Sequence, residues 1–183
     1  MKNMQRVMMI NGMLVILIAM FAGFMLLFQL VGGLEIWPGY IVELPSYGTT
    51  DGWVRAHTGG ILNGVLVMVV ALALPMLDLS EIKNKFMAYG FSYVAWSFTL
   101  FYWIGNAVAN RALTLGDNPL GESSFLSVLG FLPGLPSVLV VVILLVIGIN
   151  SLVGAGSVVT KNIKSNLIVY GNPASQRLIL NKK

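Results

Sequence analysis

The sequence contains a single histidine, His57, which is the residue best suited to hold a metal or a metal-containing cofactor. Neutral imidazole is a common metal ligand in proteins. On a helix, Gly60 and Gly64 lie within about 60° of His57, because successive residues are about 100° apart. The helix surface beside the imidazole is then almost bare backbone, against which a flat ligand could lie, and haem is the natural candidate. The same glycine spacing is typical of helix packing, which would make His57 a structural residue.

A second set of polar residues shares one face of a helix further along the chain. The set is spaced i, i+3, i+7 and i+11 and comprises Thr99, Tyr102, Asn106 and Asn110. Neighbouring helices of a membrane bundle run in opposite directions, so Tyr102 and Asn106 fall in the same leaflet as His57 and Asn63. Polar groups from two helices therefore converge, which is what a binding pocket needs and also what hydrogen bonding between helices needs.

Aromatic residues crowd the same segment, Phe101 and Trp103 among them. They can line an apolar cavity for an aromatic substrate, or they can form the aromatic belt at a membrane surface. Other familiar chemistries lack their residues. One histidine and no cysteine cannot supply an ordinary zinc site within one chain. No Ser-His-Asp triad is apparent, and no carboxylate pair lies within the apolar segments, so neither a hydrolase nor a proton relay is indicated.

Long apolar segments must position these residues. The chain of 183 residues is 57% hydrophobic and 10% charged, whereas soluble domains are about 25% charged. A membrane helix needs about 20 apolar residues. Four segments qualify, at about 7–30, 54–77, 86–109 and 136–158. We expect an all-α, integral membrane four-helix bundle that forms a single domain over residues 1–183.

The ends of these segments carry further signals. The first apolar run is too long for a signal peptide, so we expect it to be retained. Pro75 and Asp78 end the second helix, and Pro136 is expected to begin the fourth, after a cluster of prolines and glycine. The apolar stretch 125–132 is short and is expected to be interfacial or re-entrant. Residues 159–183 are expected to form a cytoplasmic tail.

Lysine and arginine residues predict the orientation, because they gather in cytoplasmic loops. In a four-helix arrangement nine of them fall on one side, and only Arg55 and Arg111 fall on the other. Both termini are therefore predicted to be cytoplasmic. The protein itself is predicted to lie in the inner membrane of a bacterial cell. The net charge of +4 lies in loops and tails, so it indicates membrane orientation and no nucleic-acid partner.

Two short motifs resemble the styrene oxide isomerase family. They are Arg55-Ala-His57-x-x-Gly60-x-x-Asn63-Gly64 and Phe101-Tyr102-Trp103-x-x-Asn106. With four predicted helices, they make the chain similar to that family over about residues 7–158. The resemblance implies a membrane-embedded haem b enzyme that assembles as a homotrimer. It also implies a reaction, the Meinwald rearrangement of a small hydrophobic aryl epoxide (styrene oxide type) to an aldehyde (phenylacetaldehyde type).

The resemblance implies roles for individual residues. His57 is expected to be the axial ligand of a ferric haem, whose open coordination position would act as a Lewis acid on the epoxide oxygen. Tyr102 is expected to donate a hydrogen bond to that oxygen and Asn63 to orient it. A dry apolar pocket would keep water from trapping the cation that forms. The further pocket candidates are Phe101, Trp103 and Asn106, and the residues expected against the haem are Gly60 and Gly64.

Helix geometry adds the expectation of a shared site. His57 and Asn63 point about 120° apart on one helix, so they cannot easily reach opposite faces of one haem from a single subunit. A site between neighbouring subunits removes the difficulty. Two rival functions remain: a non-catalytic haem protein, such as a membrane cytochrome or haem sensor, and a cofactor-free accessory membrane subunit in which His57 only bonds a neighbouring helix.

Overall fold

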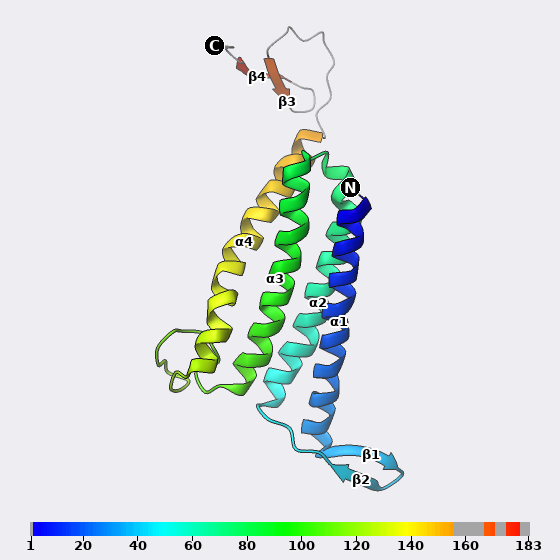
Figure 1. Ribbon diagram of the computed structural model, residues 1–183, viewed down its shortest axis with the longest axis vertical. Coiled ribbons are helices and arrows are strands. Elements are labelled where there is room, and N and C mark those ends of the chain that lie inside the picture. The colour runs from blue at the N-terminus through cyan, green and yellow to red at the C-terminus, as the bar shows by residue number, and fades with distance from the viewer. Residues whose placement is uncertain (1, 156–166, 171–174, 180–183) are drawn as a thin grey trace.

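Four long helices run side by side in a computed structural model that describes residues 2–155, 167–170 and 175–179 (Figure 1). They are α1 (Lys2–Val31), α2 (Thr50–Ala73), α3 (Glu81–Ala107) and α4 (Phe125–Ala155), and a short 3-10 helix, η1 (Leu74–Leu77), extends α2. Helix α2 packs against both α1 and α3, and α3 also packs against α4. The predicted four-helix architecture is confirmed.

Three of these helices are long and apolar enough to cross a membrane: α1, α2 with η1, and α4. Helix α3 has 27 residues, so it is long enough as well, but small polar residues and the tyrosine and tryptophan rings lower its mean hydropathy. Ser92, Ser97 and Thr99 of this helix are buried, whereas its Tyr89, Tyr93 and Trp96 rings are exposed. The fold is therefore that of an integral membrane protein in which the most polar of the four helices packs against the other three.

Helix α4 begins at Phe125, so the predicted start at Pro136 and the separate interfacial piece before it are wrong. Each proline removes a backbone donor from the helix. Membrane helices tolerate this where side chains and neighbouring helices satisfy the freed groups. The carbonyls freed in this way are those of Leu129 and Leu132, four residues before each proline. Beside them the Ser137 hydroxyl donates to the Gly134 carbonyl at 2.6 Å, and the Tyr93 hydroxyl on α3 donates to the Pro133 carbonyl at 3.2 Å, which ties this part of α4 to α3.

Two hairpins depart from the all-α prediction. Strands β1 (Gly33–Trp37) and β2 (Tyr40–Glu43) pair antiparallel directly after α1. Their turn places Gly39 at φ +82°, a left-handed conformation that glycine adopts without strain. A second hairpin, β3 (Leu167–Tyr170) with β4 (Ser175–Ile179), lies in the expected tail. Both are short additions to the bundle, and in Figure 1 the first projects sideways from the end of α1.

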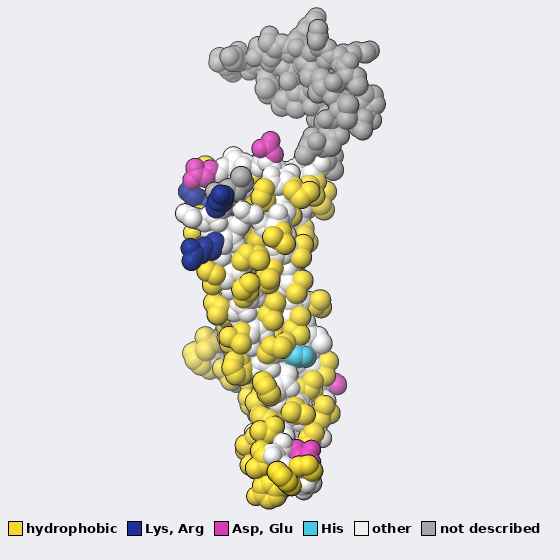
Figure 2. Space-filling view, turned by 90° about the vertical axis from the view of Figure 1, so that its right-hand side faces the viewer, with side chains coloured by type: hydrophobic (Ala, Val, Ile, Leu, Met, Phe, Trp, Pro, Cys, Tyr) yellow, Lys and Arg dark blue, Asp and Glu magenta, His cyan; other side chains and the backbone are white. Residues whose placement is uncertain are grey.

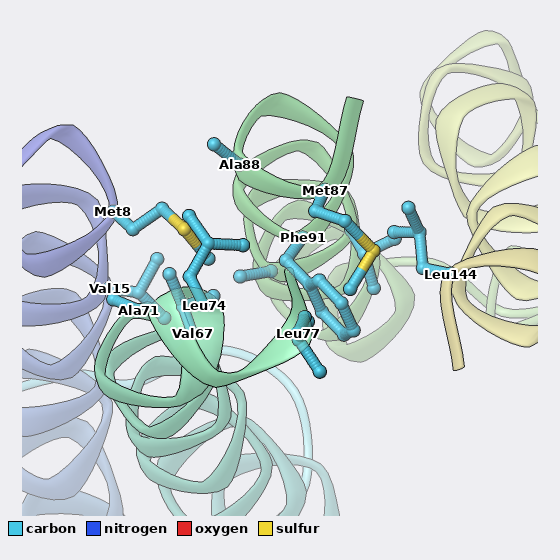
Figure 3. Close-up of a cluster of buried hydrophobic side chains, with 12 residues drawn as sticks. Met8, Val15, Val67, Ala71, Leu74, Leu77, Met87, Ala88, Phe91 and Leu144 are labelled. Carbon is cyan, nitrogen blue, oxygen red and sulfur yellow. The ribbon is translucent and has the colours of Figure 1, made fainter. Parts of the chain in front are cut away.

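The principal packed cluster lies toward the end of the bundle that holds the first residues of α1 (Figure 3). Its largest fully buried members include Met8 from α1, Leu74 from η1, Phe91 from α3 and Leu144 from α4. Lipid tails are as apolar as these side chains, so close packing rather than escape from water stabilises the cluster. The predicted site residues lie toward the opposite end of the helices, outside this cluster.

The location of the termini remains a prediction, and a reporter fusion tests it. The described residues near the first turn of α1 and the α2–α3 connection carry Lys2, Arg6, Lys83 and Lys85, and Figure 2 shows dark blue side chains at that end of the bundle. We expect a reporter that works only in the cytoplasm to be active when it is fused to the C-terminus. A fusion active only on the other side of the membrane would contradict the charge rule for this chain.

Candidate functional site

His57 is held by a hydrogen bond to the backbone of α1. Its Nδ1 lies 2.8 Å from the carbonyl oxygen of Ala19. A carbonyl can only accept, so Nδ1 carries the proton and the neutral imidazole keeps a lone pair on Nε2. A metal-binding histidine is typically oriented in this way, by donating its other ring N–H to a carbonyl or carboxylate. The arrangement leaves Nε2 as the free ligand atom.

Gly23 of α1 makes room for the imidazole. A Cβ atom built on Gly23 would lie 2.8 Å from both Nδ1 and Cε1 of His57, closer than real side chains approach. The sequence motifs did not single out Gly23 or Ala19, because both lie on another helix and one acts through its backbone. His57 is partly exposed, and Figure 2 shows its ring, in cyan, at the surface of the bundle.

Gly60 and Gly64 lie in the contact between α1 and α2. A Cβ on Gly60 would meet the Ala19 Cβ at 2.7 Å, and a Cβ on Gly64 would meet the Gly12 carbonyl oxygen at 2.6 Å. Helix α1 therefore occupies the space that the bare glycine face offered to a flat ligand. This placement favours the helix-packing alternative for these two glycines.

The surroundings of His57 fit an axial ligand of haem. The tautomer is fixed by Ala19, Nε2 has no hydrogen-bond partner among the described residues, and the ring lies at the bundle surface, where a large flat molecule can approach. No group of three or more His, Cys, Asp or Glu residues that could hold a bare metal ion occurs within the described part of the chain. A cofactor that needs one protein ligand suits this donor set.

Asn63 and Tyr102 approach each other across the contact of α2 with α3. The Asn63 side chain lies close to the Tyr102 hydroxyl. The buried Nδ2 of Asn63 nevertheless has no hydrogen-bond partner among the described residues. A buried donor without a partner costs about 1–3 kcal/mol, so this position is suited to an acceptor that arrives with a ligand. Asn63 and Tyr102 therefore lie near each other across the two helices, and their roles in a site stay predictions.

Gly59 determines where the Tyr102 ring lies. A Cβ on Gly59 would come within 2.6 Å of Cε2 and 3.0 Å of Cζ of that ring. We expect Gly59→Ala to displace the hydroxyl, and a misplacement of about 1 Å at a reacting group can cost about 10²-fold in rate. Turnover of the purified variant, compared with Thr58→Ala on the exposed side of α2, measures the effect. Unchanged turnover in Gly59→Ala would show that the ring position does not matter.

Asn106 fastens the beginning of α2 to α3. Its Oδ1 accepts hydrogen bonds from the backbone N–H of Thr49 at 2.9 Å and from the Thr49 hydroxyl at 3.2 Å. Thr49 is also the N-cap of α2, since its hydroxyl accepts from Gly52 N at 3.1 Å. The Nδ2 of Asn106 is buried and has no partner among the described residues. The Oδ1 of Asn106 therefore makes a structural contact, and its Nδ2 is available to donate a hydrogen bond.

A cavity of about 160 Å³ opens beside Tyr102 and Asn106. Its wall is completed by Gly52, Arg55, Phe101, Gly105, Arg111 and Leu113. An apolar cavity of similar volume adjoins it and shares Phe101 and Leu113 with it. A larger space of about 760 Å³ lies between the end of α1 and β2, and none of the predicted site residues lines it.

Trp103 contacts a different part of the bundle from the cavity. Its ring meets that of the fully buried Trp53 edge-on, with centroids 5.1 Å apart. The Nε1–H of Trp53 donates to the Tyr47 carbonyl at 2.7 Å, whereas the buried Nε1 of Trp103 has no partner among the described residues. Burial raises the pKa of Tyr47, so its hydroxyl stays protonated at neutral pH. Trp103 thus belongs to a packed aromatic group, and it does not line the cavity as Phe101 and Tyr102 do.

Two members of the predicted polar face do not share the site. The Thr99 hydroxyl is buried and donates to the Ala95 carbonyl of its own helix at 2.8 Å. Asn110 follows the end of α3, so it is not on the helix as the spacing predicted. It is fully buried and organises the following loop, where its Oδ1 accepts from Ala112 N at 3.0 Å.

His57 and the Asn63–Tyr102 pair therefore lie on different sides of α2. His57 faces α1, whereas Asn63 faces α3, as their spacing predicted. Within one chain the free Nε2 and the cavity beside Tyr102 do not converge on a single space between the helices. The expectation that a neighbouring subunit completes the site stays a prediction.

Comparison with known proteins agrees with this combination of fold and residues. A family model described as styrene oxide isomerase matches residues 4–153. The styrene-oxide isomerase of Pseudomonas fluorescens is 38% identical over 148 residues, which cover 80% of this chain and 88% of that protein. The match spans all four helices and contains every predicted site residue. The chain therefore belongs to the styrene oxide isomerase family.

Proposed function

We propose that this chain isomerises aryl epoxides of the styrene oxide type to aldehydes of the phenylacetaldehyde type, with ferric haem b bound through His57. Membership of the family makes the chain an epoxide isomerase. The observation that supports haem is the bond from His57 Nδ1 to the Ala19 carbonyl, which leaves Nε2 free to bind iron. When bound, a ferric haem with one protein ligand supplies a Lewis acid at its open coordination position.

The residues of the α2–α3 contact are suited to the substrate oxygen. The Tyr102 hydroxyl can donate a hydrogen bond to the epoxide oxygen, and the unpartnered Nδ2 of Asn63 can donate a second. Both interactions strengthen as negative charge builds on that oxygen during ring opening. The C–O bond to the benzylic carbon breaks, a hydride moves to that carbon from its neighbour, and the carbonyl forms. The product is an isomer of the substrate, so no electron donor is required.

The apolar surroundings of the cavity favour formation of the aldehyde over formation of a diol. A benzylic cation in water is trapped as a diol, so exclusion of water favours the hydride shift. Phe101 lies between the cavity beside Tyr102 and the adjoining apolar cavity, whose other lining residues are apolar or glycine. Such a lining suits an aryl ring and offers no group that could attack the cation.

A labelled substrate tests the reaction and the cofactor together. The purified full chain is incubated with styrene oxide that carries two deuterium atoms on the terminal carbon. We expect a Soret band at one haem per chain, and an aldehyde that retains both deuterium atoms, because one migrates and one stays. Loss of one deuterium to solvent would indicate a route through a diol or enol. A red protein that forms no aldehyde would indicate a cytochrome or sensor, and an active colourless protein would refute the haem proposal.

A further inference from the structure

Two arginines line the cavity beside Tyr102 without an acidic partner. Arg55 comes from α2, and Arg111 comes from the loop after α3. The ion pair formed within the described residues joins Lys85 to Glu81 at 2.7 Å, so neither arginine has a carboxylate partner there. They are also the only Lys or Arg of residues 2–155 at this end of the bundle.

The backbone is held in an unusual conformation where it presents Arg111. Arg111 has φ +55° and Ala112 has φ +54°, both in the left-handed region that residues with side chains rarely adopt. Each such residue costs about 1–3 kcal/mol, and the surrounding structure must offset that cost. Here the Ala112 N–H donates to Asn110, and the Arg111 carbonyl lies against Gly105, where a Cβ would approach to 2.8 Å. The loop is thereby folded back over the cavity.

Donors without acceptors accumulate in this cavity. The buried Nδ2 of Asn106 has no partner among the described residues, and it lines the same cavity as the two guanidinium groups. Buried polar groups are nearly always hydrogen-bonded in the functional state of a protein. Arg55 is exposed and Arg111 is half-buried, so the donor that lacks an acceptor in the protein interior is the Asn106 amide. The two cations beside it suit a ligand rich in negatively charged oxygen. Arginine is the side chain best suited to carboxylates, because its fork of N–H groups matches their geometry.

We propose that Arg55 and Arg111, assisted by Nδ2 of Asn106, bind the carboxylates of the haem. This inference rests on the proposed function, since it requires that haem is bound. Haem carries its two carboxylates on one edge, and charged groups in a membrane protein lie near the surface or pair with opposite charge. The two arginines lie at the end of the bundle, and the haem carboxylates would supply their opposite charges. Since His57 faces α1 and the cavity faces α3, the haem that one chain holds through His57 reaches the arginines of a neighbouring copy.

The test compares haem with its dimethyl ester, which keeps the macrocycle and iron but lacks the negative charges. The full chain, produced without haem synthesis, is titrated with each compound and followed by the Soret band. We expect the wild type to bind the ester about tenfold more weakly than haem, because carboxylate pairing at a partly open site is worth about that much. Haem loss from the natural holoprotein to a soluble scavenger gives the same comparison as a rate.

Variants assign the effect to the two residues. Arg55→Gln with Arg111→Gln should bind haem and ester equally, and Arg55→Lys should restore part of the preference. Lys83→Gln at the opposite end removes one cation without altering the preference, and serves as the control. Equal binding of haem and ester by the wild type would overturn the inference while leaving haem binding intact. The inference would also be overturned if the arginine variants lost bound lipid phosphate while their affinity for haem stayed unchanged. That result would assign the cavity to phospholipid. Failure of the wild type to bind haem at all would instead refute the proposed function.

Discussion

His57→Ala is expected to reduce bound haem from one per chain to background. No other histidine exists to replace it, and the chain has no cysteine, so neither of the commonest protein ligands for haem iron remains. The measurement is the Soret absorbance per chain of the purified protein, with isomerase activity read on the same sample. Activity should fall with the haem, because the open coordination position is lost together with the cofactor.

A matched substitution separates loss of the ligand from loss of folding. Thr58 is the next residue along α2, is exposed, and donates only to Val54 of its own helix. Thr58→Ala should therefore keep haem at the wild-type level. His57→Gly opens a space beside the Ala19 carbonyl, so free imidazole should enter it and restore the Soret band. Stoichiometric haem with an unaltered spectrum in His57→Ala would rule out His57 as the ligand.

Sequence reasoning succeeds here where one local pattern decides the outcome. The four apolar segments predict four helices, because a segment in lipid must satisfy its own backbone. Helix periodicity then places His57 and Asn63 on different sides of α2, and antiparallel neighbours bring Asn63 to the depth of Tyr102. Each inference needs only the spacing of residues along a helix and the thickness of the membrane.

The features that could not be predicted from the sequence depend on how separate helices meet. Ala19 orients His57 through a carbonyl that every residue possesses, and Gly23 matters only because α1 crosses α2 at that level. The same crossing fills the glycine face that seemed free for a ligand. The predicted start of α4 is wrong because proline commonly ends a helix in water, whereas α4 continues through Pro133 and Pro136, as helices in a membrane can.

Tyr102→Phe is expected to lower turnover per bound haem by about 10²- to 10³-fold, the usual cost of removing one donor aimed at developing negative charge. The ring and its packing against Gly59 are kept, and only the hydroxyl is lost. Haem should stay bound at one per chain, because Tyr102 is not its ligand. Some activity should survive, since the proposed Lewis acid does not depend on the hydroxyl.

The control for this substitution is Tyr93→Phe on the same helix. The Tyr93 hydroxyl donates to the Pro133 carbonyl and takes no part in the cavity beside Tyr102. Its loss should lower thermal stability slightly and leave turnover per haem at the wild-type value. If Tyr102 were only an interfacial or packing residue, its substitution would behave in the same way as that of Tyr93.

Asn63→Ala completes a double-mutant cycle with Tyr102→Phe. Each single variant removes a donor that we assign to the epoxide oxygen, and the two side chains lie within reach of each other. The free-energy effects of substituting neighbouring groups that act on one atom are not additive. The double variant should therefore be less impaired than the product of the two single effects on turnover. Purely additive losses would mean that the residues act at separate points of the reaction. Wild-type turnover per haem in both single variants would end the catalytic assignment of the pair, even if the protein binds haem and isomerises epoxides.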